Sequence, residues 1–223
     1  MNGKVKLLYL IGQYPAINHG YLLAEVRHLR SLGFQLETVS VSLPDRPKEA
    51  LTQAEREEAA RTYYIKSLSL MDMVRVNLAE FVLHPLRYLR GLAFVLRLPG
   101  LALRKIPHYF AYLAEAIILG RRMRELDVDH VHASFSATVA LIAARIFPIT
   151  WSFGVYGFGE LHDPSGTHLS ERIKSARFIR SNSKFGRGQL MLSCYRGEWR
   201  KLLYCPLGID PAEFVARGNG QRQ

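Results

Sequence analysis

Some of the residues best suited to chemistry follow the first apolar run of the chain, where a strand would end. After residues 6–11 comes a loop that contains Asn18, His19 and Gly20. Asn18 can cap the helix that follows, and Gly20 lets a ligand approach the backbone closely. Such a loop suits an anion, because the first N–H groups of a helix lack intrahelical partners. An ordinary capped turn is the alternative interpretation.

Two other groups of residues superficially match metal-binding patterns. His130 and His132 lie two positions apart and share one face of a strand, but no third ligand stands at a suitable spacing. Asp127 and Asp129 form an Asp-X-Asp pattern used by some metal-dependent enzymes. They precede their strand, so we interpret them as a solvated turn at the opposite edge of the sheet. We therefore predict no metal site.

Several function classes are excluded by missing motifs. The sequence has no P-loop, no Gly-X-Gly-X-X-Gly fingerprint and no Gly-X-Ser-X-Gly elbow. Cys194 and Cys205 form neither a disulfide framework nor a zinc motif, which favours a reducing, cytoplasmic compartment. The net charge of +11 indicates an anionic partner. Because no nucleic-acid-binding module is recognisable, we expect no nucleic acid partner.

The most informative part of the sequence starts at Trp151. Three segments carry a family resemblance: WSFGVYGFGEL at 151–161, SERIKSARFIRSNSKFGRGQL at 170–190 and YCPLGIDPAEF at 204–214. Together they resemble the N-terminal domain of family 4 glycosyltransferases, particularly the exopolysaccharide-type members. Looser similarity extends upstream, so that nearly the whole chain is covered.

The resemblance implies a GT-B enzyme that moves a sugar, with retention, from a nucleotide sugar to an acceptor such as a lipid-linked glycan. No metal is required in that family. Its first domain mainly holds the acceptor, and its second domain binds the nucleotide-sugar donor. The sequence stops shortly after Gly208 and Asp210, where the second domain would begin. We therefore expect activity to need a donor-binding domain, supplied in cis or in trans.

The resemblance also assigns candidate site residues. Tyr156 stands where the family has a histidine, and Gly154 where it has a threonine, while Gly157 and Glu160 match the pattern. A phenol with a pKa of about 10 can donate a hydrogen bond but cannot replace an imidazole near neutral pH. The catalytic candidates that the resemblance gives are Tyr156, at the histidine position, and Glu160. The substrate-binding candidates are Asn18, His19, Gly20, Ser134, Gly157 and Ser183.

The elements that must position these residues alternate along the chain. Apolar runs predict strands at residues 6–11, 36–41, 130–133, 149–153, 178–181 and 202–205. Helical patterns occupy residues 20–32, 138–146, 168–176 and 185–192. This order predicts an α/β, Rossmann-like three-layer sandwich with a parallel sheet, one half of a GT-B fold. Since parallel strands end at one edge, we expect a common edge for Asn18, His19, Gly20, Tyr156, Gly157, Glu160 and Ser183.

Residues 68–125 break this alternation with a long run of helix formers, in which Pro85, Pro99 and Pro107 predict helix starts or kinks. Apolar residues recur there at helical spacing among arginines: Leu78, Phe81, Val82, Leu86, Leu89, Leu92, Phe94 and Val95. This pattern predicts interfacial helices that dock on an anionic membrane surface. In the alternative interpretation, the apolar stripe packs on the sheet and the arginines are solvated. No apolar stretch is long enough for a membrane span.

The chain is predicted to form one domain over residues 1–214, with a basic helical insertion at 68–125. Residues 215–223 are expected to be a disordered tail or the start of an interdomain linker. The leading hypothesis is an acceptor-binding domain in polysaccharide or glycolipid biosynthesis, cytoplasmic and peripheral on the inner face of the membrane. The rival is a non-enzymatic, basic module that binds a membrane or a partner protein.

Overall fold

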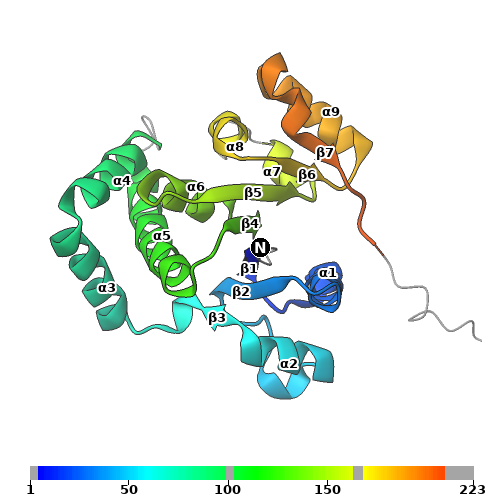
Figure 1. Ribbon diagram of the computed structural model, residues 1–223, viewed down its shortest axis with the longest axis horizontal. Helices are drawn as coiled ribbons and strands as arrows, with labels where there is room; N and C mark the ends of the chain where they lie inside the picture. Colours follow the sequence, from blue (N-terminus) through cyan, green and yellow to red (C-terminus); the bar gives the residue numbers. More distant parts are fainter. Residues whose placement is uncertain (1–4, 99–102, 163–167, 209–223) are drawn as a thin grey trace, which may run out of the picture.

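The computed structural model describes residues 5–98, 103–162 and 168–208 and is built on one seven-stranded sheet (Figure 1). All strand pairs are parallel, in the order β3-β2-β1-β4-β5-β6-β7. The strands are β1 (Lys6–Gln13), β2 (Gln35–Ser42), β3 (Tyr63–Tyr64), β4 (His130–Ser134), β5 (Thr150–Val155), β6 (Ile179–Ser181) and β7 (Leu202–Tyr204). The direction of winding reverses between β1 and β4, which is where doubly wound folds bind ligands.

Helices cover both faces of the sheet. They are α1 (Gly20–Ser31), α2 (Gln53–Arg61), α3 (Leu70–Leu83), α4 (Pro85–Arg97), α5 (Ile106–Leu126), α6 (Ala137–Ile146), α7 (Phe158–His162), α8 (Leu169–Ser175) and α9 (Lys184–Leu192). In Figure 1, α3, α4, α5 and α6 lie together at one side of the molecule, and α1 and α2 lie away from them. The predicted Rossmann-like three-layer sandwich is confirmed.

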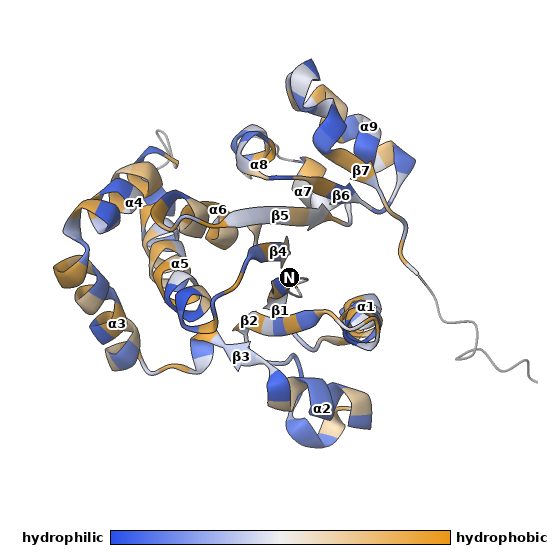
Figure 2. Ribbon diagram, in the orientation of Figure 1, coloured by the Kyte–Doolittle hydropathy of each residue, from blue (hydrophilic) through white to orange (hydrophobic). Residues whose placement is uncertain are grey.

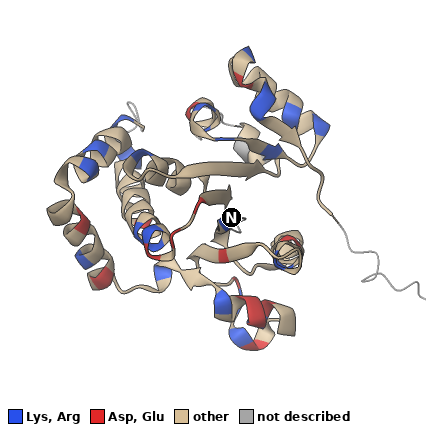
Figure 3. Ribbon diagram, viewed as in Figure 1, with Lys and Arg blue, Asp and Glu red and all other residues tan. Residues whose placement is uncertain are grey.

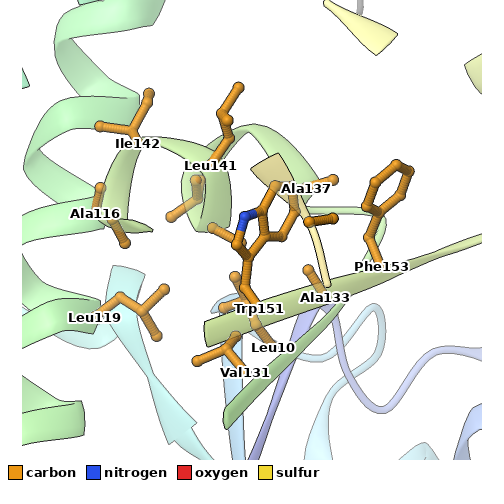
Figure 4. Close-up of a cluster of buried hydrophobic side chains, with 14 of the residues drawn as sticks. Leu10, Ala116, Leu119, Val131, Ala133, Ala137, Leu141, Ile142, Trp151 and Phe153 are labelled. Atoms are coloured by element: carbon orange, nitrogen blue, oxygen red, sulfur yellow. The ribbon is translucent and has the colours of Figure 1, made fainter. Parts of the chain in front are cut away.

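The two faces of the sheet differ in chemistry because successive strand residues point to opposite sides. One face carries Leu10, Trp151 and Phe153 and packs against α5 and α6, which forms the main hydrophobic core (Figure 4). On the other face, Tyr9 and Ile11 pack against α1 in a smaller cluster. The rest of that second face, on β4 and β5, is polar and buried, and its chemistry belongs to the site described below.

The region 68–125 contains α3, α4 and α5, which differ in their positions. α5 lies next to the sheet and has buried residues along most of its length. α3 and α4 form an outer pair that packs on α5 and α6. Pro85 and Pro107 lie in the first turns of α4 and α5, as predicted, and Pro99 lies outside the described residues. None of the described helices combines the length and the apolar character needed to cross a bilayer.

Candidate functional site

The loop between β1 and α1 forms one wall of the site. A 3-10 turn (Ile17–His19) runs directly into α1, so that His19 is the residue before the helix. No side chain caps this helix, and the expectation that Asn18 caps it is therefore wrong. Asn18 and Gly20 are exposed, and a Cβ atom at Gly20 would meet nothing within 4 Å. The loop therefore leaves room for a ligand.

Four aromatic rings link this loop to the ends of β4 and β5. The ring of Phe135 stacks on His19, with centroids 4.5 Å apart, and on Tyr156, with centroids 5.2 Å apart. The fourth ring is that of Tyr21 in α1, whose centroid lies 5.4 Å from the centroid of the Tyr156 ring. Phe135 has a left-handed φ of 63°, and a Cβ atom at Gly12 would stand only 3.2 Å from the Cβ of Phe135. A bulky residue in this conformation is strained and is held in place by its surroundings.

Below the rings, hydroxyl groups form a buried network on the sheet. The Tyr156 hydroxyl lies 2.9 Å from the Ser134 Oγ and 3.4 Å from the Tyr9 hydroxyl. The Tyr9 hydroxyl donates a hydrogen bond of 3.0 Å to Glu25, which also forms an ion pair with Arg180. The Arg180 guanidinium lies over the Tyr156 ring, 5.8 Å from its centroid. The network thus connects α1, β1, β4, β5 and β6.

Burial decides the protonation of this network. Desolvation, followed by the negative charge of Glu25, raises the pKa of Tyr156 above its usual value near 10. Burial likewise raises the pKa of Tyr9. Both phenols are therefore neutral at physiological pH and are hydrogen-bonding groups rather than general bases.

Gly154 and Tyr156 are sterically linked. The Tyr156 side chain folds back over the strand, and a Cβ atom at Gly154 would lie 2.6 Å from its ring. Any side chain at position 154 therefore conflicts with this placement of the tyrosine. The glycine therefore makes room for the ring.

A cavity of about 270 Å³ opens beside Tyr156, between the ends of β5 and β6. It is lined by Val155, Tyr156, Gly157, Leu161, Asn182, Ser183, Phe185, Gly186 and Gln189. The Ser183 Oγ caps α9 by accepting a hydrogen bond of 2.9 Å from the Gly186 N–H. The Asn182 side chain donates to the Tyr156 carbonyl at 2.9 Å and fixes the loop. Glu160 belongs to α7, but its side chain lies outside the described part of the structure.

The two histidines of β4 share one hydrogen-bonding partner. The His130 Nε2 and the His132 Nδ1 both lie 2.8 Å from the Ser152 Oγ. Burial lowers the pKa of His132 to about 3, so its imidazole is neutral at physiological pH. Within residues 5–98, 103–162 and 168–208, no group of three potential ligands could hold a metal ion.

The structure thus brings several predicted residues together. His19, Ser134 and Tyr156 are connected by stacking and hydrogen bonds, and Gly157 and Ser183 line the neighbouring cavity. Residues that the sequence did not single out complete the site: Tyr9, Glu25, Phe135 and Arg180. Tyr9 and Arg180 carry a signal in the sequence, because each is a polar or charged residue inside a short predicted strand. Glu25 of α1 and Phe135 after β4 carry no such signal.

No protein-family model and no curated protein matches the sequence. Among solved structures, the fold is similar to a glycosyltransferase from Rickettsia africae ESF-5, with a TM-score of 0.51 and 14% identity. That alignment covers 96% of this chain and 47% of the Rickettsia chain. MurG of Acinetobacter baumannii aligns with a TM-score of 0.47 and 13% identity over 92% of this chain and 47% of its own. The chain therefore spans about half the length of these proteins.

Proposed function

We propose that the chain is the acceptor-binding half of a retaining, nucleotide-sugar-dependent glycosyltransferase in polysaccharide or glycolipid biosynthesis. The observation that carries the proposal is the joint placement of the aromatic group, the hydroxyl network and the cavity at the carboxyl edge of the sheet. Open α/β sheets bind their ligands at this edge. The similarity of the chain to about half of a glycosyltransferase supports the same proposal.

The site has the chemistry that a sugar acceptor needs. Ring faces pack against the apolar side of a sugar, and hydroxyl, amide and backbone groups pair with its polar edge. In this proposal Tyr156 is a neutral hydrogen-bonding group that holds the site in shape. Glu160 is the remaining candidate for acid–base chemistry. The donor is a nucleotide sugar bound by a second domain, and no metal is required.

Ligand-observed NMR on the 223-residue chain tests acceptor binding, with octyl glycosides of glucose, galactose, mannose and N-acetylglucosamine as probes. Phe185 lines the cavity and is 70% exposed, so Phe185→Ala removes a contact without opening the core. Phe34 is also exposed, at 45%, but it precedes β2 at the opposite edge of the sheet. Phe34→Ala is therefore the matched control.

We expect at least one glycoside to bind the wild-type chain and the Phe34→Ala variant but to lose most of its signal with Phe185→Ala. The chain alone is expected to leave nucleotide sugars unchanged. Absence of glycoside binding, or equal loss in both variants, contradicts the acceptor role. Robust sugar transfer by the chain alone contradicts the need for a donor-binding domain.

A specific observation also favours membrane docking through the outer surface of α3 and α4. Figure 2 shows many hydrophobic segments on these two helices. Leu78 is 58% exposed, Val82 67% and Leu86 81%. The predicted apolar stripe is therefore split: its N-terminal members face outward, whereas Val95 is buried and packs on the core. Exposed apolar surface of this kind marks an interaction site.

The charges beside this surface favour an anionic bilayer as the partner. Figure 3 shows basic segments along α4. Arg90 and Arg97 are exposed and have no ion pair among the described residues. Arg87, in contrast, pairs with the buried Glu80 at 3.6 Å and has a structural role. Each free cation near an acidic leaflet contributes about 1 kcal/mol, so apolar contacts and several charges must act together.

Co-sedimentation with liposomes tests this docking. We expect binding to phosphatidylcholine vesicles that contain phosphatidylserine, and a loss of binding when salt is added. The double variant Arg90→Glu and Arg97→Glu should weaken binding about tenfold or more. Arg27→Glu with Arg61→Glu changes the net charge equally on α1 and α2 and serves as the control. Equal binding to neutral vesicles, or none to acidic ones, contradicts the proposal.

A further inference from the structure

A second and larger cavity lies at the carboxyl end of β2, between the loop after this strand and α2. Its volume is about 640 Å³, within the range of about 300–1,000 Å³ typical of small-molecule sites. It is lined by Leu43, Pro44, Asp45, Arg46, Pro47, Lys48, Leu51, Arg56, Ala59, Ala60 and Tyr64. The lining thus combines apolar side chains with three cations and one carboxylate.

The three cations are not equally available. Arg46 forms ion pairs with Asp45 and Glu55, which hold it in place and neutralise its charge. Lys48 and Arg56 have no carboxylate partner among the described residues. Arg56 uses one N–H group on the Leu51 carbonyl, at 2.6 Å, and a guanidinium has further donors to offer. The cavity therefore has two uncompensated positive charges.

This cavity is joined to the candidate acceptor site. The Gln13 side chain donates to the Leu43 carbonyl at 3.1 Å, and the Ile17 N–H donates to Asp45 at 2.8 Å. These bonds fasten the loop after β2 to the loop after β1. The β1–α1 loop therefore stands between the two cavities, with His19 stacked toward Phe135 and Tyr156 on one side. Both cavities lie at the carboxyl edge of the sheet, on either side of this loop.

We propose that the cavity between the β2–α2 loop and α2 binds a phosphate group that the acceptor carries. A guanidinium and an ammonium are the side-chain groups that recognise phosphate by charge-assisted hydrogen bonds. The apolar lining contacts the carbon part of the same ligand, which distinguishes a phosphorylated sugar from the free ion. The assignment of this phosphate to an acceptor rests on the proposed function.

Isothermal titration calorimetry of the full 223-residue chain tests the assignment with glucose 1-phosphate, inorganic phosphate and glucose. We expect glucose 1-phosphate to bind severalfold more tightly than inorganic phosphate, and glucose not to bind this cavity. Arg56→Gln and Lys48→Gln should each weaken glucose 1-phosphate binding about tenfold. Arg61→Gln is the matched control, because Arg61 lies on the same helix and does not line the cavity. Circular dichroism and thermal unfolding confirm that each variant folds.

Unchanged binding by Arg56→Gln, or an equal loss by Arg61→Gln, overturns the phosphate site. Equal affinities for inorganic phosphate and glucose 1-phosphate overturn the assignment to an acceptor and leave a site for the free ion. The outcome is separate from that of the glycoside experiment, in which Phe185→Ala changes the other cavity. If Arg56→Gln acts as expected while Phe185→Ala does not, the phosphate site stands and the proposed acceptor site at Tyr156 fails.

Discussion

Replacing Gly154 with alanine tests whether this glycine is required by the position of Tyr156. The new Cβ atom would stand 2.6 Å from the tyrosine ring, closer than real Cβ atoms approach other heavy atoms. The ring must move, and it then loses its 2.9 Å hydrogen bond to Ser134 and its stacking on Phe135. These losses are worth about 1 kcal/mol and about 0.5–1.5 kcal/mol. Allowing for overpacking, we expect Gly154→Ala to lower the free energy of unfolding by about 1–3 kcal/mol.

Urea denaturation measures this change through the fluorescence of Trp151, which is buried on the same strand. In a Tyr156→Ala background the same Gly154→Ala substitution should change the free energy of unfolding by less than about 0.5 kcal/mol. Gly157→Ala is the control, because its Cβ atom would meet nothing within 4 Å. If Gly154→Ala is equally destabilising with and without the Tyr156 ring, the steric link between the two positions is refuted.

Two further predictions concern ionisable side chains that are removed from solvent, His132 and the Glu25–Arg180 pair. Between pH 7.5 and 5.0 the unfolded chain protonates His132 near its usual pKa of about 6.5, whereas the folded chain, with a pKa of about 3, does not. The wild type should therefore lose about 2 kcal/mol more stability over this interval than His132→Gln, and equal losses in urea titrations would contradict the buried, neutral imidazole. Arg180→Met should lower the free energy of unfolding by about 1–2 kcal/mol, because it leaves the partly buried Glu25 carboxylate with the Tyr9 hydroxyl but without its ion-pair partner. Adding Glu25→Gln should recover part of this loss, and a purely additive double variant would show that the two side chains do not interact.

Most of the fold is predictable from the sequence because its signal is local. Buried parallel strands such as β1 and β5 are short apolar runs, and the helices between them carry apolar residues at helical spacing. β3 is not predicted, since a strand of two residues has no periodicity to detect. α2 is also missed, because it is strongly polar, although Thr52 and Glu55 carry the capping-box signal of its start.

The site is predictable only in part. The edge at which Tyr156, Gly157 and Ser183 lie follows from their positions after predicted strands, because every parallel strand ends at that edge. The partners of Tyr156 do not follow from the sequence, because Tyr9 and Ser134 are distant along the chain and meet it only through strand register. The direction of the tyrosine ring depends on the absence of a side chain at Gly154.

The sequence by itself determined the order of strands and helices, the parallel sheet, the basic charge and the edge where polar loops gather. These are properties of short segments, and periodicity and composition report them. Only the tertiary structure decided which half of the α3–α4 apolar stripe is exposed, that Glu25 of α1 pairs with Arg180 of β6, and that two cavities flank the β1–α1 loop. Each of these depends on contacts between residues far apart in the chain, which are fixed by packing and strand register rather than by any local pattern.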